Sequence, residues 1–233
     1  MIEVQPFGQL GRFRNEWLSA RHHFSFGGYN DPRRMGFGRL RVWNDDEIAP
    51  GTGFDPHPHR DMEIITYVRE GAITHRDSLG NEGRTTAGDV QVMHAGTGIV
   101  HAEYNQEDGP TRLFQIWIMP DRPGVAPGWG TREFPREGGE RLRVLASGRA
   151  ADAGSDALPL YADGAVLAGR IAAGSTVHET LAPGRRAYLV PATGRITVNG
   201  VEIGTRDGVA IEGESEITIT AQEDAEVVMV EVA

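Results

Sequence analysis

Short segments with alternating apolar and polar residues recur along this chain of 233 residues. Alternation with a period of two is typical of strands that bury one face. Glycine and proline, 31 and 13 residues respectively, mark the turns between these segments. Strands are predicted at 37–43, 62–68, 89–93, 113–119, 141–146, 165–171, 187–190, 195–198, 216–220 and 226–232. So many short strands in succession predict an all-β sandwich or barrel.

Two segments differ from this strand pattern. Arg12–His23 is the one stretch with a helical pattern, and we predict a short helix there. Residues 121–140 are rich in Gly, Pro and charge, which is typical of a linker. We therefore predict an N-terminal domain over residues 1–125, a linker over 126–140 and a C-terminal domain over 141–233.

The second half of the chain repeats the first in outline. When Gly71 is placed on Gly194, similar residues surround both glycines. Each half then continues to a turn and, later, to a Gly and an Asp followed by Val. This repeat predicts a duplicated barrel. In the same alignment His57 falls on Thr180, and His59 also meets no histidine. The second barrel is therefore expected to lack a copy of any site built from these histidines.

Two short motifs carry most of the predicted chemistry, His57-x-His59 and His101-x-Glu103. Residues i and i+2 of a strand point to the same face, so each motif directs two metal-binding side chains toward one place. If the two strands are neighbours, three imidazoles and a carboxylate form a site that suits iron, copper, nickel, manganese or zinc. Prolines flank the first motif, so its segment should lie at a strand start or a sheet edge.

A second carboxylate competes for the fourth position of such a site. The spacing Gly51-x5-His57-x-His59-x3-Glu63 resembles the first motif of the cupin superfamily, in which the carboxylate at the Glu63 position is usually the ligand. Glu63 is an even number of residues away from the two histidines. On one continuous strand its side chain could therefore face inward with theirs. The residues alone leave Glu63 and Glu103 as alternatives.

Three stretches in order resemble the pirin family: HHFSFG at 22–27, HPHRDMEIITY at 57–67 and QVMHAGTGIVHAE at 91–103. The resemblance is dense over roughly residues 5–125. The second half is similar to the divergent C-terminal cupin of bacterial pirins. This resemblance implies two tandem cupin barrels, a bicupin, with one metal site in the N-terminal barrel.

The resemblance also implies a ligand set and an activity. The metal ligands would be His57, His59, His101 and Glu103, with Glu63 outside the ligand set. Iron would be the first candidate metal, with copper, manganese, nickel, cobalt or zinc as alternatives. The activity would be that of a quercetin 2,3-dioxygenase, which uses O2 to cleave a flavonol and releases carbon monoxide. Glu103 would also act as the general base.

The alternative is a non-enzymatic pirin, in which the metal's redox state controls the binding of a protein partner.

Phe24, Phe26 and Met93 are candidates for an apolar wall around a planar substrate.

His75 and His94 lack carboxylate partners on the same strand face in the sequence pattern. We therefore expect them at the surface or behind the metal ligands.

Charge and composition exclude other classes of function. The chain has 33 acidic and 23 basic residues, a net charge of −10, which argues against nucleic-acid backbones and anionic membranes as partners. It has no cysteine, so thiolate chemistry and disulfides are excluded. No signal peptide and no long apolar run is recognisable, which predicts a cytoplasmic protein.

Overall fold

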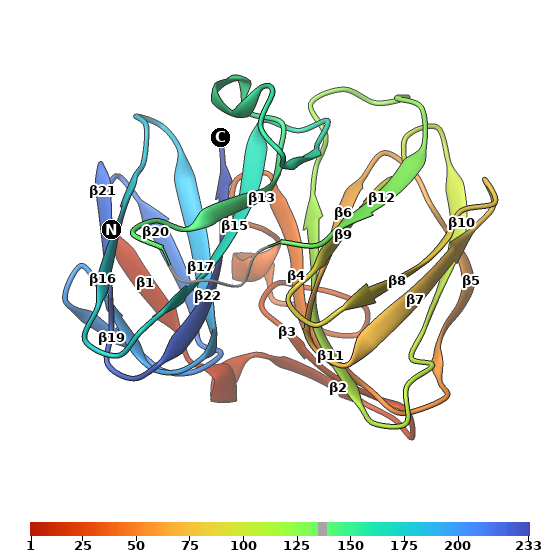
Figure 1. Cartoon of the computed structure of the whole chain (residues 1–233), viewed down its shortest axis with the longest axis horizontal. Coiled ribbons are helices and arrows are strands. Elements are labelled where there is room, and N and C mark those ends of the chain that lie inside the picture. Colours follow the sequence, from red (N-terminus) through yellow and green to blue (C-terminus); the bar gives the residue numbers. More distant parts are fainter. Residues whose placement is uncertain (135–138) are drawn as a thin grey trace. The chain divides into compact units, whose positions relative to one another are not determined.

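The computed structural model describes residues 1–134 and 139–233, and nearly all of its regular structure is β (Figure 1). Three short 3-10 helices, Phe7–Gln9, Pro32–Arg34 and Ala150–Asp152, complete the elements of this described part. None of its helices has the length and apolar character needed to cross a membrane. The chain divides into two compact units, and the all-β prediction is confirmed.

The first unit, which we call the N-terminal barrel, comprises residues 11–134 and 158–163. One of its sheets has the order β5 (Gly53–His59), β10 (Ile99–Tyr104), β7 (Ala72–Asp77) and β8 (Glu82–Thr86). The other has the order β12 (Gly128–Arg132), β9 (Val90–His94), β6 (Glu63–Glu70), β11 (Thr111–Ile118), β4 (Leu40–Ile48), β3 (Leu18–His22) and β2 (Gly11–Arg14). All pairings within these two sheets are antiparallel. The segment 158–163 begins with the short strand β14 (Leu158–Pro159).

The second unit, which we call the C-terminal barrel, comprises residues 1–10, 139–157 and 164–233. Its larger sheet contains, in order, β1 (Ile2–Gln5), β20 (Gly208–Glu212), β17 (Arg186–Thr193), β22 (Ala225–Val232), β15 (Gly164–Ile171) and β13 (Arg143–Ser147). Its smaller sheet contains β16 (Thr176–Thr180), β21 (Glu216–Ala221), β18 (Ile196–Val198) and β19 (Val201–Ile203).

The helix predicted at residues 12–23 is wrong, because the segment forms the hairpin β2–β3. The Asn15 side-chain oxygen accepts the backbone N–H groups of Trp17 and Leu18, at 3.0 and 2.7 Å, and so fixes the turn. Burial then alternates along β3, where Leu18 and Ala20 face the interior. The period of the segment is therefore two, and its weak helical pattern came from the residues of the turn.

The observed units differ from the predicted domains. Strand β1 pairs with β20, so the first ten residues belong to the C-terminal barrel. Residues 158–163 belong to the N-terminal barrel. Within the predicted linker, β12 pairs with β9 as an edge strand of the N-terminal barrel. Its Gly-rich sequence is tolerated because an edge strand pairs on one side only. The linker residues 135–138 lie outside the described residues.

The two barrels repeat the same arrangement of strands. The smaller sheets correspond in order, since β16 pairs with β21 as β5 pairs with β10. Gly71 (φ 74°) joins β6 to β7, and Gly194 (φ 75°) joins β17 to β18. A positive φ suits glycine, which lacks a Cβ. The alignment that placed Gly71 on Gly194 therefore matches equivalent turns. His57 lies on β5, and Thr180 lies on the equivalent strand β16.

The interiors of the barrels differ in polarity. The C-terminal barrel is filled by one cluster of buried apolar residues, among them Leu167, Val177 and Ile219. In the N-terminal barrel, Val68 and Ile64 of β6 belong to two separate apolar clusters. Thr66 lies between them and belongs to a layer of buried polar side chains, whose other members include Gln91, His101, Glu103 and Gln115. Buried polar groups need partners, so this layer is where a site is expected.

Gly194→Ala is expected to destabilise the protein more than Gly200→Ala. Both glycines have positive φ, 75° and 82°, so each substitution carries a strain of about 1 kcal/mol. A Cβ at Gly194 would lie 2.5 Å from the carbonyl oxygen of Asp224, whereas one at Gly200 would meet nothing within 4 Å. Urea denaturation should show a loss about 2 kcal/mol larger for Gly194→Ala. Equal losses would contradict the crowding of this turn.

Candidate metal centre

The strand pairing of β5 with β10 brings the two predicted motifs together. β5 is an edge strand of its sheet, as predicted from its prolines. His57 pairs with His101, and Ile99 of β10 pairs with His59. The register then shifts, so that Glu103 pairs with Phe54 and β5 has an extra residue opposite Ala102. This bulge re-aims the side chains at the place where the two motifs meet.

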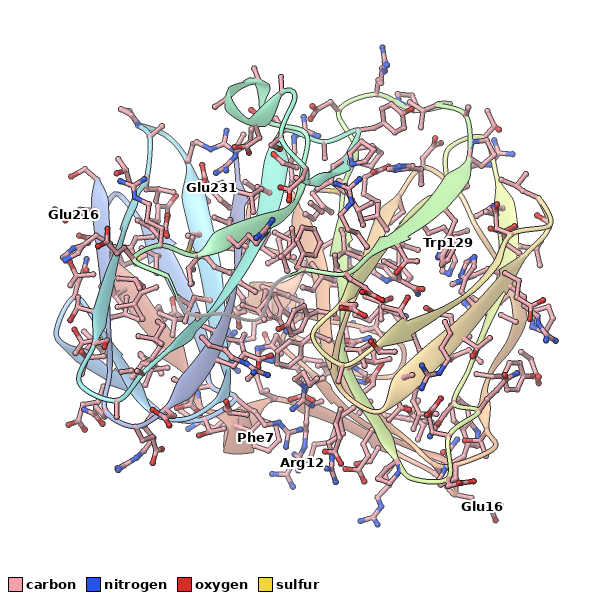
Figure 2. The ribbon with its side chains drawn as sticks, viewed as in Figure 1. Phe7, Arg12, Glu16, Trp129, Glu216 and Glu231 are labelled. Atoms are coloured by element: carbon pink, nitrogen blue, oxygen red, sulfur yellow. The ribbon has the colours of Figure 1, made fainter. Side chains whose placement is uncertain are left out.

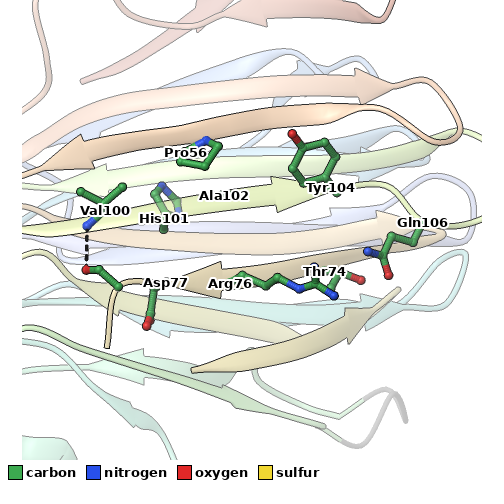
Figure 3. Close-up of a pocket in the computed structure, with 10 residues that line it drawn as sticks. Pro56, Thr74, Arg76, Asp77, Val100, His101, Ala102, Tyr104 and Gln106 are labelled. Carbon is green, nitrogen blue, oxygen red and sulfur yellow. Dashed lines mark hydrogen bonds between the residues drawn. The ribbon is translucent and has the colours of Figure 1, made fainter. Parts of the chain in front are cut away.

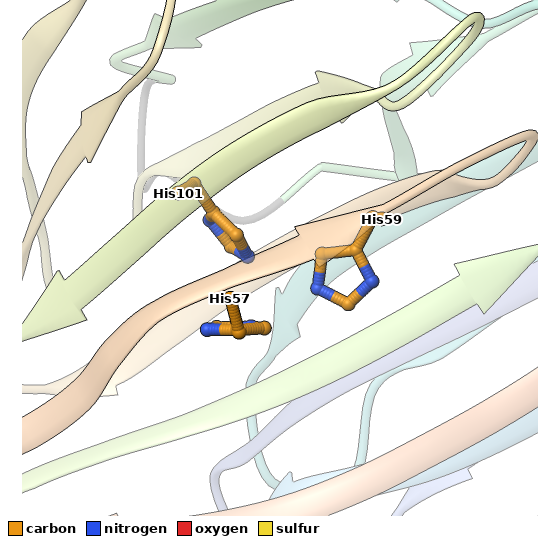
Figure 4. A group of neighbouring side chains, drawn as sticks. All are labelled: His57, His59 and His101. Atoms are coloured by element: carbon orange, nitrogen blue, oxygen red, sulfur yellow. The ribbon is translucent and has the colours of Figure 1, made fainter.

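Three imidazoles converge between these strands (Figure 4). One nitrogen each from His57, His59 and His101 can be chosen so that all three lie within 4.8 Å of one another. The ring centroids are 4.5 to 5.0 Å apart in all three pairs. His101 is buried, and the other two rings are partly exposed. The predicted meeting of the three histidines is therefore observed.

Hydrogen bonds determine which nitrogen of His57 and His101 is available. His57 Nδ1 lies 2.7 Å from the Asp55 carbonyl oxygen and donates to it, which leaves Nε2 free to bind a metal. His101 Nδ1 lies 3.4 Å from His75 Nδ1, and His75 Nε2 lies 3.0 Å from Asp77 Oδ2. Asp77 accepts the proton of His75 Nε2, so His75 Nδ1 accepts the proton of His101 Nδ1. His101 Nε2 is then left as an unprotonated ligand atom.

Burial keeps the imidazoles of His59 and His101 in the neutral form that binds metals. It lowers the pKa of His59 to about 4, with a further contribution from the neighbouring His57. It lowers the pKa of His101 to about 2, with contributions from His57, His59 and His75. Neutral imidazole is the ligand form, so at pH 7 neither of these two rings must lose a proton before a metal binds.

The carboxylate of Glu103 lies near His101 but outside the cluster of the three histidines, and protein groups engage it. It is fully buried, and it forms a second cluster with His75 and His101 in which the nitrogens and the carboxylate oxygen again lie within 4.8 Å. Gln91 Nε2 donates to Oε1 at 2.6 Å, and Gln115 Nε2 donates to Oε2 at 2.9 Å. Burial raises the pKa of Glu103 to about 7, against the opposing effect of these hydrogen bonds.

Two tryptophans orient the two glutamines. Trp129 Nε1 donates to Gln91 Oε1 at 3.2 Å, and Trp117 Nε1 donates to Gln115 Oε1 at 3.3 Å. An indole N–H can only donate, so each amide must turn its oxygen toward the indole and its NH2 group toward Glu103. Trp129, which extends from β12 in Figure 2, was assigned by sequence to the linker.

The same two indoles also pack against histidines of the site. Trp129 stacks on His75 with ring centroids 4.9 Å apart, and Trp117 meets the edge of His59 at 5.0 Å. The sequence analysis missed this role of both tryptophans. A tryptophan in a Gly-rich segment, as in Gly128-Trp129-Gly130, was the available signal.

Glu63 does not join the cluster. Its Oε2 accepts from His94 Nδ1 at 2.6 Å and from the Tyr161 backbone N–H at 3.1 Å. Thr66, three residues later on β6, contacts Glu103 from the opposite face of the strand. Glu63 could share a face with the histidines only if one continuous strand joined them. A turn containing Asp61 (φ 47°) separates β5 from β6, so the alternation does not carry over.

The predictions for His75 and His94 need one correction. Both have carboxylate partners, Asp77 on the same face of β7 and Glu63 on the neighbouring strand. His75 lies directly behind His101. A position behind the metal ligands was one of the two locations expected for it.

The apolar wall is only partly as predicted. Phe26 lines a cavity of about 240 Å³ in the N-terminal barrel, but Phe24 and Met93 are not among the residues that line it. Met93 packs instead with Ile64 and Ile99. None of the three clustered histidines lines the cavity, but Phe54 and Gln115 do, and the Phe54 ring centroid lies 6.2 Å from that of His57. Phe54 therefore separates the cavity from the histidine cluster by one side chain.

A second hollow of about 350 Å³ lies on the other side of β10 (Figure 3). Val100, Ala102 and Tyr104, at alternating positions of β10, line it together with Arg76 of β7. The Val100 N–H donates to Ser78 Oγ at its rim, at 3.2 Å. This hollow is open, and its polar groups do not converge on one point, so it is the weaker candidate for a substrate site.

The residues present fit a metal ion. Nε2 of His101 is buried and has no hydrogen-bond partner among the described residues. An unpaired buried imidazole nitrogen costs about 1–3 kcal/mol, and a metal ion at this place would remove that cost. Three imidazoles, with a carboxylate close to one of them, suit a divalent transition metal and leave coordination positions open.

Comparison with known proteins also indicates a metal-binding protein. The chain matches the family described as Pirin over residues 3–118 and the Quercetinase C-terminal cupin domain over residues 144–232. The fold and the histidine cluster thus define a cupin metalloprotein built from two tandem cupin barrels. The chain belongs to the pirin family.

Individual relatives cover nearly the whole chain. A pirin-like protein of Caulobacter vibrioides is 58% identical over 234 residues, which is 100% of both chains. The quercetin 2,3-dioxygenase of Escherichia coli is 41% identical over 230 residues, 98% of this chain and 97% of that protein. The crystal structure of the bacterial pirin YhhW from Escherichia coli in complex with nickel(II) has a TM-score of 0.93 and 39% identity, and covers 100% of this chain and 99% of that one.

Gln91→Leu is expected to weaken metal binding, because it removes one of the two amide donors that hold Glu103. The removal of such a partner of a metal ligand typically costs about 10- to 100-fold in affinity. Gln106→Leu, at an exposed position, is the matched control and should bind metal like the unaltered protein. Competition with a chelator measures both affinities. Equal affinities for the two variants would show that Glu103 needs no such support.

Proposed function

We propose that this protein is a metal-dependent dioxygenase that cleaves the heterocyclic ring of a flavonol such as quercetin with O2 and releases carbon monoxide. The main support is the cluster of three imidazoles, next to which Phe54 forms part of the aromatic wall of a cavity. The name of the Escherichia coli relative supports the substrate class. A cytoplasmic location stays a prediction.

In this proposal His57, His59, His101 and Glu103 hold one divalent transition metal ion per chain. Iron is the metal that we propose, and copper, manganese, nickel, cobalt and zinc are alternatives. Nickel is the ion in the complex of the related pirin. When bound, the metal supplies a Lewis acid that lowers the pKa of a substrate hydroxyl and favours its reaction with O2.

The chain's own residues handle the proton and the rings. Glu103 is the proposed general base, because its carboxylate forms a cluster with His101, which is also a member of the three-histidine cluster. Gln91 and Gln115 hold its two oxygens in place. The phenyl rings of Phe26 and Phe54 line the cavity, where they would pack against a planar substrate and exclude water.

The overall reaction balances. The C2–C3 and C3–C4 bonds of the flavonol break together with the O–O bond of O2. C3 leaves with its oxygen as carbon monoxide, and both atoms of O2 remain in the ester product, a depside. The proton of the 3-hydroxyl group moves to Glu103 and then to the new carboxyl group of the product.

The iron-loaded protein should consume O2 and quercetin in equal amounts and release carbon monoxide. His57→Ala should lose both the metal, by elemental analysis, and the turnover, because it removes a ligand. His178→Ala, an exposed histidine of the C-terminal barrel, should retain both. Absence of turnover with each of the six metals, in protein shown to hold one metal ion, would refute the dioxygenase.

The alternative function is metal-dependent binding of a protein partner. The open hollow beside β10 favours it, since Val100 is 40% exposed there and lies next to His101. If the loaded protein lacks turnover but retains a partner in only one iron oxidation state, the regulatory function replaces the enzymatic one.

A further inference from the structure

The cavity beside the metal centre has an apolar side and a polar side. Its volume of about 240 Å³ exceeds the roughly 150 Å³ at which an apolar protein cavity accepts benzene, so a substituted aromatic ring fits. The apolar lining residues are Phe13, Leu18, Ala20, Phe26 and Phe54. The polar lining residues are His22, Asn44, Asp46 and Gln115.

Three of the four polar residues already have partners. His22 Nδ1 and Asn44 Oδ1 lie 2.8 Å apart and bond to each other. Gln115 accepts from Trp117 and donates to Glu103, as described above. Each of these three residues therefore commits at least one polar atom to maintaining the wall.

Asp46 is different from these three. The residue is 2% exposed, and its Oδ1 is buried without a hydrogen-bond partner in the described residues. The nearby cation does not satisfy it, because Arg69 bonds to Asp45, whose side chain points to the other face of β4. A buried polar atom at a cavity wall, with no partner of its own, is available to a ligand.

The surroundings of Asp46 favour the neutral acid. Burial raises its pKa well above the ordinary range, and the charges of Asp45 and Glu103 raise it further. A protonated carboxyl group can both donate and accept a hydrogen bond. A phenolic hydroxyl group also does both, so the two groups are complementary.

We propose that Asp46 forms a subsite that recognises a hydroxyl group on the aromatic ring of the ligand. The cavity's apolar side holds the ring, and Asp46 selects rings that carry a hydroxyl over bare ones. This inference rests on the proposed function only for the ligand's other end, which would face the histidine cluster. It adds a specificity residue that lies outside the proposed ligand set.

The test measures binding of two probes that cannot be turned over. Luteolin is quercetin without the 3-hydroxyl group, and flavone is the same ring system without any hydroxyl. By isothermal titration calorimetry, the metal-loaded protein should bind luteolin about ten-fold more tightly than flavone, which corresponds to one satisfied buried hydrogen bond. Equal affinities, or binding of neither probe, would overturn the subsite.

Two variants then assign the preference to Asp46. Asp46→Leu should bind luteolin and flavone equally, and Asp46→Asn, whose amide also donates and accepts, should restore much of the preference. A preference that survives in Asp46→Leu would overturn the assignment. If Asp46→Leu does not fold, retention of the preference by Asp46→Asn together with its loss in Asp46→Val gives the same decision.

The result of the binding test does not depend on whether the protein is a dioxygenase. Failure of the dioxygenase would appear as absence of turnover of 3-hydroxyflavone, which has the reacting hydroxyl but no ring hydroxyls. Failure of the subsite would appear only in the comparison of luteolin with flavone.

Discussion

The burial of the Glu103 carboxylate is the constraint around which the N-terminal barrel is arranged. A carboxylate in a barrel interior is costly unless its oxygens are hydrogen-bonded or bound to a cation. Here each oxygen receives an amide N–H from a glutamine, and each glutamine is turned the right way by a tryptophan. Burial still raises the pKa of Glu103 to about 7, because the loss of water outweighs the hydrogen bonds from Thr66, Gln91 and Gln115. A divalent cation beside it would complete the compensation.

A comparison of the two barrels shows how the burial of Glu103 affects the residues of the barrel interior. Both barrels have the same order of strands in the smaller sheet and the same glycine turn. Among the described residues, however, most of the buried polar side chains lie in the N-terminal barrel, whereas Glu179 and Glu231 are the buried charged ones of the C-terminal barrel. In the C-terminal barrel the interior positions are occupied by residues such as Val177 and Ile219, which need no partners. The fold therefore does not require the polar layer. The layer exists for the site, which agrees with the general separation of fold from function.

The sequence predicted those parts of the site that depend on short-range geometry. His57, His59 and His101 could be grouped because the period of a strand fixes which side chains share a face. The alternative ligand Glu63 could not be excluded in this way, because the turn at Asp61 reverses the parity. The glutamines, Trp129 and Asp46 were missed because their roles depend on contacts between distant strands, which no local pattern contains. The β2–β3 hairpin was missed because Asn15 fixes its turn through side-chain hydrogen bonds.

We propose that one metal ion binds in the N-terminal barrel and that Glu103 is its carboxylate ligand. Anomalous diffraction from crystals of the metal-loaded protein tests this claim most directly. The predicted result is one peak per chain, with nitrogens of His57, His59 and His101 and an oxygen of Glu103 each about 2.0–2.2 Å away. A peak bound by His75 or Glu63 in place of Glu103, or a peak in the C-terminal barrel, would contradict it.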